Sequence, residues 1–142
     1  MEIRLSASDY DLLSSHAADC FPEEACALLV GEKSGEGSAR VSSVVVSKNI
    51  AADPFRYFEV EPAKRIAVEK EVRKTDQCLL GVFHTHPEGD ARPSKTDERM
   101  IYEPSLIWLI ASSCKEGIET LNAFEPEPEG QGFRPITLRV VK

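Results

Sequence analysis

Three runs of nearly uninterrupted apolar residues constrain the fold of this chain more than any other feature. They are ACALLV at 25–30, CLLGVF at 78–83 and SLIWLIA at 105–111. A strand covered on both faces has this pattern, whereas a strand with one solvent-exposed face alternates apolar with polar residues. The runs therefore predict central strands of a sheet that is packed on both sides.

Helical patterns between these runs supply layers that can cover the sheet. Apolar residues recur at helical spacing up to residue 18, behind Ser6 or Ser8 as the capping residue, and again over 62–75. A serine is positioned to cap a third, shorter helix over 94–103. We therefore expect three helices.

Further strands are predicted on either side of the apolar runs. Valines in ARVSSVVVS at 39–47 indicate a hairpin partner for the first run, across the turn KSGEGS at 33–38. Near the end of the chain, two more strands are expected at 118–126 and 133–141, separated by the acidic loop EPEPEGQG at 125–132.

These elements predict a mixed α/β fold of the α+β kind, in which a central mixed, mostly antiparallel β-sheet is flanked by helices. The chain of 142 residues is long enough for one substantial hydrophobic core but short of a second. We therefore expect a single domain over 1–142.

The charge of the chain argues against some classes of partner. A formal net charge of -7 and a pI near 5.0 disfavour general binding to nucleic acid or to an anionic membrane, because both attract positive potential. The N-terminus has no signal-peptide pattern, and no apolar run approaches the roughly 20 residues that span a bilayer. A cytoplasmic location is expected.

The four cysteines do not form a metal motif. Cys20 and Cys26 are separated by more than the two to four residues usual between paired zinc ligands, and Cys78 and Cys114 stand alone. We expect free, buried thiols.

Two histidines follow the second apolar run directly, in His84-Thr85-His86. On an extended strand end, side chains two residues apart point to the same side, so both imidazoles can reach one ion. His16 lies in the first predicted helix, where capping or packing is the expected role.

A carboxylate is available to complete a metal site with this pair. Seven residues separate His86 from Ser94, and Asp97 follows in the first turn of the third predicted helix, so the loop can fold back. Two neutral imidazoles and one carboxylate suit a tetrahedral catalytic zinc whose fourth position is left to water. The predicted metal ligands are His84, His86 and Asp97.

This pattern resembles that of the JAMM metalloprotease family, also called the MPN-plus or Mov34/PAD-1 type. In that family a distant Glu precedes His-x-His-Pro, a Ser and an Asp. The matching residues here are Glu24, His84-Thr85-His86-Pro87, Ser94 and Asp97. The segment FPEEACALLVG at 21–31 resembles the family's Glu-x-Cys-Gly-Leu-Leu-x-Gly strand, which makes Glu24 rather than Glu23 the counterpart of its Glu.

The resemblance implies catalytic roles for two residues. Glu24 would accept a proton from the attacking water and return it to the leaving amine, and Ser94 would donate a hydrogen bond to the oxyanion. Ser94 can serve as a helix N-cap at the same time.

The resemblance also implies a substrate class. No long insertion or extra Cys/His cluster is present, so the chain is most similar to compact prokaryotic-type members. Such members act after the C-terminal Gly of ubiquitin-like or sulfur-carrier proteins, which makes a Gly-Gly carrier the expected substrate. Two alternatives stay open: a non-catalytic MPN-type binding module, and a RadC-like DNA-linked protein, which HTHPEGDARPSKTD also resembles.

Overall fold

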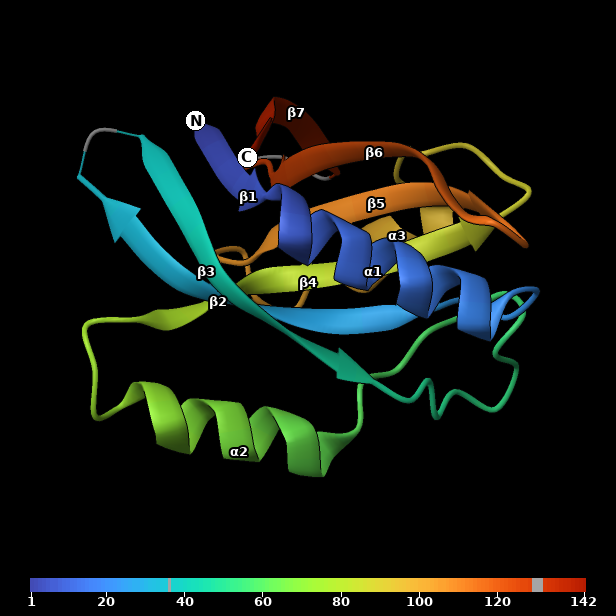
Figure 1. Ribbon diagram of the computed structural model, residues 1–142, viewed down its shortest axis with the longest axis horizontal. Helices are drawn as coiled ribbons and strands as arrows, with labels where there is room; N and C mark the ends of the chain where they lie inside the picture. Colours follow the sequence, from blue (N-terminus) through green and yellow to red (C-terminus); the bar gives the residue numbers. More distant parts are fainter. Residues whose placement is uncertain (36, 129–131) are drawn as a thin grey trace.

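The computed structural model describes residues 1–35, 37–128 and 132–142 (Figure 1). Its strands are β1 (Glu2–Ser6), β2 (Cys26–Ser34), β3 (Ser38–Ser47), β4 (Cys78–Pro87), β5 (Ile107–Cys114), β6 (Gly117–Pro126) and β7 (Phe133–Val141). Its helices are α1 (Ala7–Cys20), α2 (Pro62–Val72) and α3 (Lys95–Arg99). The predicted turn at 33–38 and the predicted loop at 125–132 lie partly outside the described residues.

The strands close into a barrel in the order β1-β3-β2-β4-β5-β6-β7, with β7 returning to β1. Four neighbouring pairs are antiparallel, namely β2 with β3 and β4, and β6 with β5 and β7. The other three pairs are parallel. The prediction of a mixed, mostly antiparallel sheet flanked by helices is confirmed.

Strand β1 was not predicted from the sequence. It is only five residues long, with Ile3 and Leu5 fully buried, and it pairs in parallel with both β3 and β7. Two apolar residues are too few to establish a period of two. The partners of β1 come from the far end of the chain and from β3, so the barrel closure has no local signal.

The helix boundaries differ in part from those predicted. Ser6 rather than Ser8 caps α1, because its side chain accepts a hydrogen bond from the amide of Asp9. Helix α2 ends at Val72, three residues before the predicted end. Helix α3 ends at Arg99 instead of residue 103, and the proline at 104 disfavours helical geometry in the residue before it.

Two hydrophobic cores lie on opposite faces of the sheet. On one face, Leu13 of α1 packs with Leu29, Phe83 and Leu109, and Figure 1 shows α1 crossing this face. On the other face, Val82 and Trp108 pack with Val68 of α2 and with Phe58. Because side chains alternate along β4, His84 belongs to the face of Val82, under α2 and the segment that follows α3.

The cysteine prediction is partly wrong. All four thiols are free, and Cys26 is buried, with burial raising its pKa to about 12. Cys78, however, is exposed, because it is the first residue of β4 and lies outside the buried part of that strand. No helix in the described ranges is both long and apolar enough to cross a bilayer.

Gly81 marks a close approach between β4 and β5, and it provides a test of the fold. A Cβ at this position would lie 1.9 Å from the backbone oxygen of Ile107, so the strands would have to separate. We expect Gly81→Ala to lower the free energy of unfolding by about 1–3 kcal/mol, as overpacked sites do. Urea unfolding checks this, with Gly35→Ala as the control, because a Cβ there meets no described atom within 4 Å. Equal midpoints for the two variants would contradict the β4–β5 register.

Candidate metal centre

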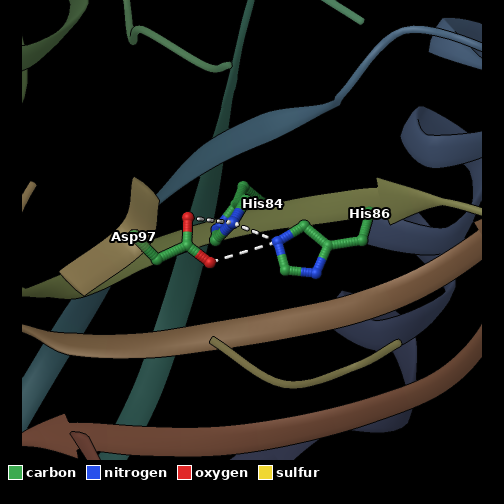
Figure 2. A group of neighbouring side chains, drawn as sticks. All are labelled: His84, His86 and Asp97. Carbon is green, nitrogen blue, oxygen red and sulfur yellow. Dashed lines mark hydrogen bonds and ion pairs between the residues drawn. The ribbon is translucent and has the colours of Figure 1, made fainter. Parts of the chain in front are cut away.

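Figure 2 shows the three predicted metal ligands converging on one point. His84 and His86 come from the end of β4, and Asp97 comes from the first turn of α3. The Nε2 atoms of the two histidines lie 3.1 Å apart. The Asp97 carboxylate faces both, with Oδ1 3.2 Å from Nε2 of His84 and Oδ2 3.1 Å from Nε2 of His86.

The protonation pattern of this group favours a bound cation. Nδ1 of His86 lies 2.7 Å from the backbone oxygen of Asp90, which can only accept, so Nδ1 carries the proton. In the neutral ring, Nε2 then presents a lone pair to the Asp97 carboxylate and to His84. Ligand atoms on a tetrahedral zinc with bonds of about 2.0–2.1 Å would lie roughly 3.3 Å apart. The observed spacings are close to that value, so this donor set fits a divalent cation.

Electrostatics favour the metal-binding forms of His84 and Asp97, whereas they favour the protonated form of His86, so a bound cation would have to displace that proton. Burial lowers the pKa of His84, against the pull of Asp97. Burial would likewise lower the pKa of His86, but hydrogen bonds to Asp97 and to the Asp90 carbonyl outweigh it and raise that pKa. Burial opposes ionisation of Asp97, yet its contacts with the imidazoles of His84 and His86 and with the Ser94 amide hold its pKa well below the usual range. The carboxylate is therefore ionised at neutral pH.

Aromatic side chains fix the ring of His84. Phe58 stacks on it with centroids 4.3 Å apart, and Trp108 contacts it edge-on at 5.5 Å. The ring is fully buried, and its Nδ1 has no hydrogen-bond partner among the described residues. Only Nε2 is directed at the other two ligands, so packing rather than hydrogen bonding sets the orientation of this imidazole.

Ser94 and Asp97 hold each other in a capping box. The Ser94 hydroxyl accepts a hydrogen bond from the Asp97 amide, and the Asp97 carboxylate accepts one from the Ser94 amide. Ser94 is exposed, and its hydroxyl hydrogen is not used in this box. The residue can therefore act as a helix cap and still donate a hydrogen bond outward.

Glu24 lies on the wall of the same pocket as His86 and Ser94. The pocket has a volume of about 720 Å³, and Glu24 is only 6% exposed. Burial raises the pKa of Glu24 to about 8; Asp97 and Asp53 add to this rise, and His86 opposes it. Glu23 does not line the pocket, so the geometry agrees with the choice of Glu24.

Supporting residues of this site were missed from the sequence. The side-chain amide of Asn49 donates to the backbone oxygens of Glu24 and Tyr57, and its oxygen accepts from two amides of the same loop. Thr85, between the histidines, accepts a hydrogen bond from the amide of Ala25. The contacts of these two side chains with Glu24 and Ala25 join residues 25 and 60 positions apart, so no local pattern indicates them.

A family model described as "Prokaryotic homologs of the JAB domain" matches residues 6–125, which include all five predicted site residues. The chain belongs to this family. The resemblance to the JAMM/MPN family is thereby confirmed.

Two curated relatives of this JAB-domain protein carry enzyme names. It is 29% identical over 139 residues to a protein named Desampylase from Haloferax volcanii, covering 97% of this chain and 96% of that protein. It is 26% identical over 99 residues to the CysO-cysteine peptidase of Mycobacterium bovis, covering 70% of this chain and 65% of that protein. The prediction of a JAMM-type metallopeptidase is confirmed at the level of the family.

Solved structures share the fold of this JAB-domain protein. A protein from Desulfitobacterium hafniense, solved in solution, aligns with a TM-score of 0.82 at 28% identity, covering 100% of this chain and 93% of that one. A JAB1/MPN domain protein from Archaeoglobus fulgidus aligns with a TM-score of 0.61 at 18% identity over 100% of both chains. The second likeness concerns the fold alone.

Proposed function

We propose that this JAB-domain protein is a zinc-dependent peptidase that hydrolyses the bond after the C-terminal Gly of a ubiquitin-like or sulfur-carrier protein. The observation that carries the proposal is the convergence of His84, His86 and Asp97 beside a pocket that Glu24 also lines. The relatives named Desampylase and CysO-cysteine peptidase support the peptidase activity, and the second name supports a small carrier protein as substrate. The single domain over 1–142 and the cytoplasmic location stay predictions.

The proposed mechanism assigns the proton to Glu24. A zinc ion held by His84, His86 and Asp97 would supply an acidified water and polarise the scissile carbonyl. Glu24 accepts the proton of the attacking water and returns it to the leaving nitrogen. The pKa of Glu24 is raised to about 8, which is close to neutral pH. A group with such a pKa can both accept and donate a proton.

Ser94 is proposed to stabilise the oxyanion. Its hydroxyl oxygen is held by the Asp97 amide at 3.0 Å, and its hydrogen stays available to donate outward. A donor that is already oriented needs no reorganisation when negative charge develops on the substrate oxygen. The rim of the pocket is open at Ser94, so an extended peptide can reach it.

The intact set of site residues favours an enzyme over a non-catalytic binding module. A module without catalysis has no need for a buried glutamate with a raised pKa beside a cation-binding group. Nothing in the described residues favours a DNA-linked role. The direct test is to incubate the protein with a folded Gly-Gly carrier that bears a C-terminal extension and to identify the products by mass spectrometry.

We expect the purified protein to bind about one zinc per chain at neutral pH, because three deprotonated ligands converge on one point. Occupancy should fall below a pH of about 6, where histidine side chains become protonated. Metal analysis after reconstitution measures both. His86→Ala should lose the metal, whereas His16→Ala should keep it, because His16 lies outside the group of three ligands and its Nε2 contacts the backbone oxygens of Cys26 and Ser47 and the Sγ of Cys20. Unchanged zinc in His86→Ala would exclude this site.

A further inference from the structure

The residue that follows Glu24 is bound to the metal-binding strand by both the side chain and the backbone amide of Thr85. The amide of Ala25 donates a 2.8 Å hydrogen bond to Oγ1 of Thr85. The amide of Thr85 donates a 3.1 Å hydrogen bond back to the oxygen of Ala25. Thr85 is fully buried. Both polar groups of the peptide backbone at Ala25 are thus satisfied by one residue of β4.

The side chain of Thr85 takes the place of a missing backbone partner. Regular pairing of β2 with β4 ends at Cys26 and His84, whereas β4 continues beyond this point alongside β5. At the next position the hydroxyl of Thr85 accepts the amide of Ala25. Because side chains alternate on a strand, Thr85 projects to the face opposite His84 and His86. It can therefore hold Glu24's neighbour without occupying the metal site.

The two backbone groups of Glu24 itself are bound elsewhere. Its amide donates to the oxygen of Pro54, and its oxygen accepts from the side-chain amide of Asn49. Both partners belong to the 49–58 segment rather than to the metal-binding strand. Thr85 therefore makes the direct hydrogen bonds that join Ala25, the residue next to Glu24, to β4 at the histidine pair.

We propose that Thr85 is a positioning residue that fixes the carboxyl group of Glu24 relative to His84 and His86. This inference rests on the proposed function, because it concerns the placement of its proton acceptor. A displacement of about 1 Å in a reacting group can cost 10²-fold in rate. The loss of a residue that orients a metal site typically costs about 10–100-fold. The hydroxyl oxygen, rather than the bulk of the side chain, supplies this effect.

Paired variants at position 85 test the proposal. Thr85→Val keeps the shape but removes the acceptor, and we expect kcat to fall about 10–100-fold while KM and zinc stoichiometry stay within about threefold of wild type. Thr85→Ser keeps the hydroxyl and should keep kcat within about threefold. Amide hydrogen exchange at Ala25 should accelerate in Thr85→Val and stay slow in Thr85→Ser.

Ser14→Ala is the matched control. Ser14 Oγ accepts a hydrogen bond from the amide of Ile118 at 3.0 Å, so this variant also frees a strand amide, but at the contact of α1 with β6. It should lose stability without losing kcat. If Thr85→Val proves too unstable to purify, Thr85→Ala, which leaves space for water beside the Ala25 amide, is measured in its place.

Three results would overturn the role of Thr85: full kcat in a folded Thr85→Val protein, equal loss in Thr85→Ser, or unchanged exchange at Ala25. The proposed function fails in a different way, through a zinc-loaded wild-type protein that cleaves no carrier. In that case the exchange at Ala25 still decides whether the Thr85 hydroxyl holds the backbone beside Glu24.

Discussion

Glu24→Gln is expected to lower kcat/KM about 10²–10⁴-fold while the fold and the bound zinc are retained. The amide has the shape of the carboxyl group but cannot accept the proton of the attacking water. Glu24 is not one of the three converging ligands, so zinc stoichiometry should not change. Steady-state kinetics on an extended carrier, with metal analysis of the same samples, measure both quantities.

The neighbouring glutamate and the pH dependence of stability provide controls for this variant. Glu23 does not line the pocket, so Glu23→Gln should remain active. Burial raises the pKa of Glu24 from 4.5 to about 8, so the folded, metal-free protein binds more protons than the unfolded chain in that range. Stability contributed by this group therefore falls as pH rises from about 4.5 to about 8. Glu24→Gln removes that loss, so the variant should be no less stable than the metal-free wild type near pH 8. Inactive Glu23→Gln beside active Glu24→Gln would mean that the register of this segment is shifted by one residue.

The central strands and the convergence of His84, His86 and Asp97 were predictable because their signals are local. The apolar run at 78–83 leads directly into His84 and His86, and Asp97 is the third residue after Ser94. A strand end and a helical first turn are enough to direct these three side chains. The spacing of these residues in the sequence therefore predicts that the three side chains meet, and the structure brings them together.

The features that the sequence did not predict depend on residues far apart in the chain. Ile3 and Leu5 become a strand only because β3 and β7 lie beside them. Phe58 and Trp108 orient His84 from segments that lie 50 residues apart in the sequence. Thr85 meets Ala25 across 60 residues. In each case the short-range pattern is compatible with several partners, and the closed sheet selects one of them.

The pocket itself argues for glycine at the cleavage site. Its lining includes the rings of Phe55, Phe124 and Phe133 as well as Pro87 and Pro93, which lie around His86 and Ser94. Proline and aromatic rings are stiff, so they adjust poorly to a branched side chain next to the scissile carbonyl. Glycine presents no side chain that could meet these rings, and it adopts extended geometries readily. A Gly-Gly tail is therefore the expected form of the substrate.

A folded carrier that ends in Gly-Gly plus one further residue should be cleaved after the second Gly, and replacing that Gly by Val should reduce cleavage at least about 10²-fold. The reason is positional: a carbonyl held about 1 Å from its reactive place can lose this much in rate. Mass spectrometry of the carrier before and after incubation gives the site and the extent of cleavage. The matched control is a Val substitution several residues upstream in the same tail, which should be tolerated better. Equal cleavage of the Gly and Val carriers, or of an unstructured peptide without the carrier, would indicate a general peptidase, because discrimination would then depend neither on the rings that line the pocket beside His86 nor on a folded partner.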